Sequence, residues 1–166
     1  MMTQRKAQTA VWGLLAMLIF IAIAGALVDI YRLFAARNWA YSVAQEAALA
    51  GASKGRDWSA IMSGGEIRLV QSTAETAAEN LVVAEMSARG IHGYAMDVRV
   101  LPDPAGGSVT GYPPRPVRLG NNLGNWISDE PAVGVYLVVP VDWLLLDQIG
   151  IIGKTVSAFA AAGVAQ

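Results

Sequence analysis

The residues that could catalyse a reaction or bind a metal are few in this sequence. His92 is the only histidine, and the chain has no cysteine. Zinc and haem sites draw most of their ligands from these two residue types, so one histidine alone predicts neither site. His92 stands beside Gly93, and an imidazole in such a turn-like segment is more often a surface residue than a catalytic base. The sequence therefore favours a protein that is not an enzyme and has no cofactor.

Charged residues do not indicate a binding site either. The glutamates Glu75, Glu79 and Glu85 are interpreted as the solvated face of a helix rather than as a catalytic pair. The formal net charge is −1, and no basic cluster is present. Nucleic-acid binding needs a concentrated positive surface, so we expect no nucleic-acid partner.

The strongest signal is an apolar run without any charge between Lys6 and Asp29. The run comprises residues 7–28, which as a helix would be about 33 Å long at about 1.5 Å per residue. The apolar core of a bilayer is about 30 Å thick, so this helix is long enough to cross it. Arg5 and Lys6 favour a cytoplasmic N-terminus. The run exceeds the apolar region of about 7–15 residues in a secretory signal, so we expect it to be retained.

The helix is expected to continue beyond the apolar run. Residues 30–52 are rich in Ala, Leu, Arg, Gln and Glu, contain no proline, and have no glycine before Gly51. We therefore predict two parts of the chain. The first is a long helix over 1–52, apolar at 7–28 and amphipathic at 29–52, and the second is a globular domain over 53–166. Such a helix is typical of a membrane anchor or of a filament subunit.

Small residues in the apolar run indicate where two helices could approach closely. Ala22 and Ala26 have the small-xxx-small spacing found at helix–helix contacts in membranes, and Gly25 lies between them. If the helix bundles with copies of itself, its apolar side chains become the core of a polymer. On that hypothesis the expected core contacts are Val11, Leu14, Leu15, Leu18, Ile19, Ile21 and Ile23, with Ala22 and Gly25 at the close approaches.

Aromatic and charged residues gather just past the apolar run. They are Asp29, Tyr31, Arg32, Phe34, Trp39 and Tyr41. The aromatic rings fit an interfacial belt in a membrane, and they equally fit wedges between helices or beneath the globular domain. Farther along, Ala40 and Ala44 continue a narrow helix face that suits packing against the domain or against sister helices.

The globular part is predicted to combine a helix with a sheet. A glycine- and serine-rich connector over 51–65 leads to a helix that begins with a capping box at Ser72 and Glu75 and ends at Gly90. Its apolar stripe is expected to consist of Val70, Ala74, Ala77, Ala78, Leu81 and Ala88. Strands are predicted over 94–100, over 133–141 as the central strand, and over 154–164, with a crossover or helical turn over 142–153. The fold class is therefore α+β with an antiparallel sheet.

Residues 102–131 contain six of the seven prolines together with several glycine and asparagine turns. Proline removes a backbone donor, and glycine favours turns, so this composition disfavours regular strands and helices. We predict a surface excursion with little regular structure.

The order of these parts resembles the TadE/TadG-like pilus proteins of the tight-adherence (Tad/Flp) type IV pilus system. The resemblance rests on residues 5–12 (RKAQTAVW), 29–32 (DIYR) and 44–52 (AQEAALAGA), and on the apolar strand, leucine-rich crossover and small-residue strand of the C-terminal half. It covers most of the chain apart from 102–131. The sequence departs from the family pattern at Trp12, where the family often has a glutamate, and no carboxylate precedes Asp29.

This resemblance implies a structural pilin that polymerises through its apolar N-terminal helix. The implied partners are copies of the chain itself, the inner membrane before assembly, and a pilus assembly platform with its ATPase. The implied location is a cell-surface filament that supports adhesion or motility. Two other functions remain open at this point: a minor pseudopilin that acts in pilus initiation, and a bitopic, membrane-anchored binding protein that does not polymerise.

Overall fold

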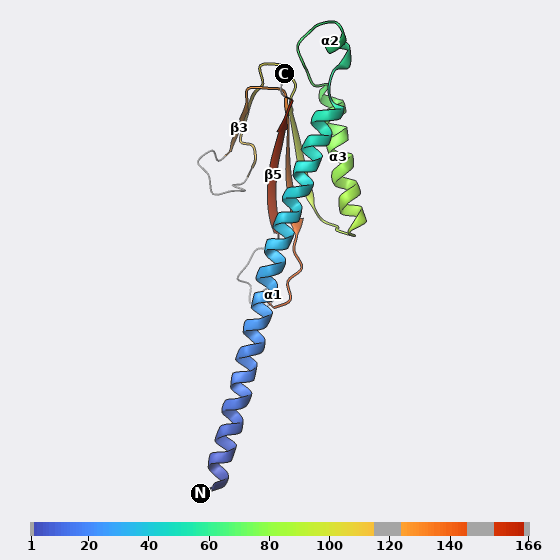
Figure 1. Ribbon diagram of the computed structural model, residues 1–166. Coiled ribbons are helices and arrows are strands. Elements are labelled where there is room, and N and C mark those ends of the chain that lie inside the picture. The colour runs from blue at the N-terminus through green and yellow to red at the C-terminus, as the bar shows by residue number, and fades with distance from the viewer. Residues whose placement is uncertain (1, 115–123, 146–154, 165–166) are drawn as a thin grey trace. The chain divides into compact units, whose positions relative to one another are not determined.

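The computed structural model describes residues 2–114, 124–145 and 155–164, with side chains from residue 11 onward. The chain begins with the helix α1 (Met2–Lys54), which runs without interruption because no proline occurs before Pro102. The predicted helix over 1–52 is thereby confirmed, with an end two residues later than expected. Figure 1 shows this helix in blue to cyan.

The chain forms two compact units, and α1 contributes to both. One unit consists of Met1–Ala35 with Val141–Lys154, and the other of Ala36–Pro140 with Thr155–Gln166. We predicted a boundary between the two parts of the chain at residues 52 and 53, close to the end of the helix. The compact units instead divide within α1, because its later residues are buried in the core of the second unit.

The second unit is built on a three-stranded antiparallel sheet with the strand order β1-β4-β5. Its strands are β1 (Ala95–Leu101), β4 (Ala132–Pro140) and β5 (Thr155–Gly163). The α+β class and the antiparallel sheet are therefore confirmed. The apolar run predicted over 133–141 is indeed the central strand, and it ends at Pro140, which lacks the donor needed to continue a ladder.

Each face of β4 packs against a different layer. Val133, Val135 and Leu137 point to one face and are fully buried, whereas Ala132 and Tyr136 point to the other face and belong to an aromatic cluster. Successive side chains of a strand alternate between faces, so a strand that is buried on both sides reads as a continuous apolar run. The paired strand β5, predicted over 154–164, follows the same alternation, since Val156, Ala158 and Ala160 are buried.

The second half of α1 and the helix α3 (Gln71–Ala88) lie side by side on one face of this sheet (Figure 1). They meet at Gly51. A Cβ atom there would lie 2.9 Å from the carbonyl oxygen of Ala74 in α3 and 3.1 Å from Cγ1 of Val133 in β4. Only a residue without a side chain permits this approach, which explains the glycine at this position.

Small residues of α1 allow that close packing along several turns. Completely buried alanines recur on one face of the helix: Ala40, Ala44, Ala47 and Ala48. Of the two alternatives left open for these alanines, packing against the protein's own domain is the one that the structure shows. At the far end of α3, the guanidinium carbon of Arg89 lies 4.3 Å from the centroid of the Trp39 ring, a cation–π contact that joins α3 to α1.

The predicted start of α3 is wrong in its details. The helix begins at Gln71, its N-cap residue is Val70, and no side chain caps it, so Ser72 and Glu75 do not form a capping box. The Nε2 amide of Gln71 donates instead to Oε1 of Glu75 at 2.9 Å, as residues four apart on a helix can. Of the predicted stripe, Ala74 and Ala78 are buried, and the face continues through Val82 and Met86 rather than through Leu81 and Ala88.

The predicted connector over 51–65 also contains a short helix that the sequence reading missed. This helix, α2 (Trp58–Met62), is capped by Asp57, whose Oδ1 accepts hydrogen bonds from the backbone N–H of Ser59 and of Ala60. The hydroxyl of Ser59 also donates to this carboxylate and is the main reason that the pKa of Asp57 lies below its ordinary value. An N-cap aspartate before a single helical turn is a common start signal.

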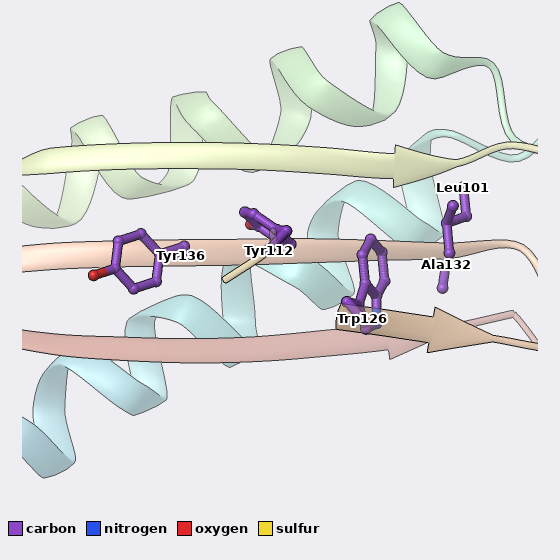
Figure 2. Packing of buried hydrophobic residues seen from close by; sticks show 5 residues of the cluster. All are labelled: Leu101, Tyr112, Trp126, Ala132 and Tyr136. Carbon is purple, nitrogen blue, oxygen red and sulfur yellow. The ribbon is translucent and has the colours of Figure 1, made fainter. Parts of the chain in front are cut away.

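The prediction of little regular structure over 102–131 is wrong for the part that the structure describes. Residues 107–110 and 125–128 form the antiparallel hairpin of β2 (Gly107–Thr110) and β3 (Asn125–Ser128). Figure 2 shows side chains of this region against the sheet, on the face opposite the helices. Tyr112, Trp126 and Phe159 pack there with ring centroids 5.4–6.2 Å apart. These contacts make the region part of the core rather than a surface excursion.

The Tyr112 hydroxyl fixes this layer to the sheet. Its oxygen lies 2.7 Å from the carbonyl oxygen of Asp97 and 2.9 Å from that of Gly134, so its proton is shared between β1 and β4. Gly134 leaves room for the rings, since a Cβ there would lie 3.0 Å from Cζ3 of Trp126. The hairpin layer is therefore held by a buried hydrogen bond as well as by aromatic packing.

Replacing Tyr112 with phenylalanine should destabilise the second unit. Tyr112→Phe keeps the ring but removes the shared hydrogen bond, and a buried bond of this kind contributes about 0.5–1.5 kcal/mol. We expect a lower urea midpoint with an unchanged slope, measured by near-UV circular dichroism in detergent micelles. Tyr41→Phe, at an exposed ring on α1, should leave the midpoint unchanged. Equal midpoints for wild type and Tyr112→Phe would contradict this role.

The difference in stability between wild type and Tyr112→Phe should depend on pH. Burial, with a smaller effect of the Asp97 charge, raises the pKa of the Tyr112 hydroxyl above its ordinary value of 10.0. The unfolded chain therefore loses this proton at a lower pH, so the tyrosine's contribution to stability declines once the pH rises above about 10. The stability gap between wild type and Tyr112→Phe should be constant near neutrality and should shrink in that alkaline range. A gap that did not change with pH would argue against a buried, protonated hydroxyl.

Candidate functional site

The first half of α1 has an exposed apolar surface in the part of the chain that the structure describes. All residues of α1 from 11 to 24 are exposed, and the most apolar window of the helix has none of its residues buried. The exposed set contains eight of the nine predicted filament contacts: Val11, Leu14, Leu15, Leu18, Ile19, Ile21, Ala22 and Ile23. By length and composition this is one helix that is able to span a membrane.

Gly25, the ninth predicted contact, has a different environment. It is buried, and a Cβ atom at this position would overlap Cδ1 of Leu145. Leu145 belongs to the same compact unit as this part of α1. Within this chain the residue next to Gly25 is therefore Leu145, and the expected close approach of Gly25 to a neighbouring helix stays a prediction.

Asp29 shows why Leu145 lies there. Its side chain is fully buried, and one carboxylate oxygen accepts the backbone N–H of Leu144 at 2.7 Å while the other accepts that of Leu145 at 2.8 Å. We call this arrangement the Asp29 clasp. Gly25 and Asp29 are four residues apart and so lie on the same face of α1, where the clasp holds the backbone and the glycine makes room for the side chain. Asp29 was expected as a simple boundary charge, and its partners are a finding of the structure.

The clasp is electrostatically reasonable although it buries a carboxylate. An ionised carboxylate loses its hydration when it is buried, and it is tolerated where several donors replace the water. Hydrogen bonds to a charged acceptor contribute about 1.5–3 kcal/mol each, more than neutral ones do. Two backbone N–H groups directed at the two oxygens supply that compensation.

The other expected boundary residues have varied surroundings. Tyr31 and Phe34 are 73% and 58% exposed, and Tyr41 is 43% exposed. Arg32 is also exposed. Trp39 is covered in part by Arg89. Trp39 therefore contacts the end of α3 within the second unit, and for Tyr31 and Phe34 both earlier alternatives stay open.

The sequence contains one pattern typical of hydrolases that the sequence analysis missed. Its serine does not stand on the turn that this pattern requires. Residues 51–55 (GASKG) match G-x-S-x-G, in which the serine stands on a tight turn between a strand and a helix. Here Ser53 lies in the last turn of α1, and its hydroxyl donates to the carbonyl oxygen of Ala50 at 3.1 Å. Among the residues that the structure describes, no three of the metal-ligating types lie close enough together to hold an ion.

Comparisons with known proteins do not assign the chain to a group. No protein-family model, no curated protein and no solved structure matches it at a significant level. The functional argument therefore starts from the uncovered apolar helix and from the Asp29 clasp.

Removing the Asp29 carboxylate should free the two backbone amides. In Asp29→Ala, the N–H groups of Leu144 and Leu145 lose their acceptors, so their hydrogen exchange should accelerate markedly. The measurement is exchange mass spectrometry of the full chain in nanodiscs. Asp142→Ala, at an exposed aspartate of the same segment, is the matched control and should leave exchange unchanged. Exchange at these amides that is already fast in the wild type would contradict the clasp.

Proposed function

We propose that this protein is a structural subunit of a Tad-type pilus. The first half of α1 lies in the inner membrane before assembly and then packs with the same part of other copies in the filament core. The second unit remains outside the lipid and forms the surface of the filament. This proposal takes the family from the sequence resemblance and the mode of association from the uncovered surface of α1.

The observation that supports the proposal best is the contrast between the two halves of one continuous helix. Within residues 40–52 of α1, seven residues are buried, and they belong to the core of the second unit. Residues 11–24 are exposed throughout and consist almost entirely of apolar side chains. An apolar surface of this extent needs lipid or protein to cover it.

A filament can replace the lipid only with equally apolar neighbours. Leaving lipid for water would cost about 1.5–3 kcal/mol for each large side chain, and burial against copies of the same helix removes that cost. Small residues make such packing close. A Cβ at Gly13 would meet nothing within 4 Å, and Ala22 is exposed, so both offer room for a neighbouring helix.

A small-to-large change at Ala22 should test helix packing without preventing membrane insertion. Ala22→Leu adds apolar bulk, which a bilayer accepts, but it keeps neighbouring helices apart. We expect normal amounts of the protein in the membrane and a strong loss of sheared filaments, measured by quantitative immunoblotting of both fractions. Ile21→Leu conserves volume on the adjacent exposed position and should leave the filament yield close to wild type.

The outcomes distinguish the proposal from the two alternatives. Unchanged filament yield in Ala22→Leu would contradict close packing at this position. A wild-type chain that remains monomeric in membranes and never enters a filament would favour the bitopic, membrane-anchored binding protein. If this chain makes up only a very small share of the subunits in purified filaments, the result would favour the minor pseudopilin.

A further inference from the structure

We propose that the segment 141–145 lies in the membrane interface beside α1 and that Asp29 is the residue that positions it there. The chain would then contact lipid through two segments that are far apart in sequence. This inference requires that the first half of α1 crosses a membrane, but it does not require that the protein polymerises.

The position of Leu145 supports a location at the edge of the bilayer. Its side chain contacts Gly25, which lies inside the charge-free run that ends at Asp29. Four residues of helix correspond to about 6 Å along the axis. Along the axis of α1, the backbone of Leu145 is therefore level with Asp29. Its side chain extends about one helical turn from there toward the N-terminus, beside the last turn of the apolar run.

Backbone hydrogen bonding explains why a carboxylate is needed at this depth. Irregular chain near lipid cannot obtain water for its N–H groups, and each unsatisfied group costs several kcal/mol. Leu144 and Leu145 are not part of any helix or strand, yet both amides are bonded to Asp29. The clasp thus satisfies the two N–H groups of Leu144 and Leu145, which would otherwise oppose a place for these two residues at lipid.

The composition of the segment fits the same environment. Trp143, Leu144 and Leu145 are consecutive, and the Leu144 side chain is 54% exposed although it is apolar. On α1, the exposed rings of Tyr31 and Phe34 follow within about two turns of Asp29. Aromatic residues prefer the level of the lipid headgroups, and leucine prefers the adjoining acyl region. Lipid is therefore the occupant that covers Leu144.

The absence of cysteine allows the depth of Leu144 to be measured directly. Leu144→Cys is labelled with an environment-sensitive fluorophore in the full chain, which is placed in phosphatidylcholine–phosphatidylglycerol vesicles at a low protein-to-lipid ratio. Leu18→Cys, Leu27→Cys and Ala35→Cys, all at exposed positions of α1, provide a depth scale for the same label. Quenching by spin-labelled lipids and by aqueous iodide is recorded for each.

We expect the label at position 144 to lie at the same membrane depth as the label at position 27. It should also be several-fold less accessible to iodide than the label at position 35. Iodide access equal to that at Ala35 would overturn the proposal. Shielding that appears only when an excess of unlabelled chain is added would also overturn it, because a second copy would then be the occupant.

The role of Asp29 is tested in the same system. Asp29→Ala should increase iodide access at Leu144 several-fold and leave the label at Leu27 unchanged, which shows that α1 is still inserted. Asp29→Asn keeps one acceptor oxygen and should give an intermediate value, whereas Asp142→Ala should have no effect. Unchanged access in Asp29→Ala would show that the carboxylate does not position the segment.

Discussion

The packing of the alanine face of α1 against α3 and the sheet is the interaction on which the rest of the structure depends. Mostly alanine side chains on this face bring the helix so close to its neighbours that a Cβ at Gly51 would crowd both Ala74 and Val133. The second half of α1 thereby becomes part of a core, while the continuous backbone carries on into residues 11–24, which are exposed in the structure as described. A single helix thus links a folded unit to an apolar surface that needs a partner.

Asp29 marks the end of that apolar surface in two ways. It is the first charge after the run of residues 7–28, and its oxygens bind the amides of Leu144 and Leu145. A buried carboxylate is costly unless donors surround it, so the clasp and the irregular segment stabilise each other. If the first half of α1 crosses a membrane, as we propose, this residue lies where the helix leaves the apolar core, with the backbone of residues 144 and 145 bound beside it.

The helix and the central strand were predictable because their signals are local. A charge-free run followed by helix-forming residues without proline predicts α1, and a continuous apolar run predicts β4. The hairpin of β2 and β3 was missed because prolines and glycines outnumber its few strand residues, and the burial of Tyr112 and Trp126 is decided by tertiary packing. The partners of Asp29 lie 115 and 116 residues away in sequence and leave no local signal, and the crossover predicted over 142–153 falls outside the described residues from 146 onward.

The central claim is that apolar helices of this protein exchange lipid for copies of themselves in a polymer. Electron microscopy of appendages sheared from cells, followed by mass spectrometry of the purified fibres, tests it most directly. The account predicts thin fibres in which this polypeptide is the principal component and which disappear when its gene is deleted. Fibres that lack the polypeptide, or a polypeptide that stays solitary in the membrane, would contradict it.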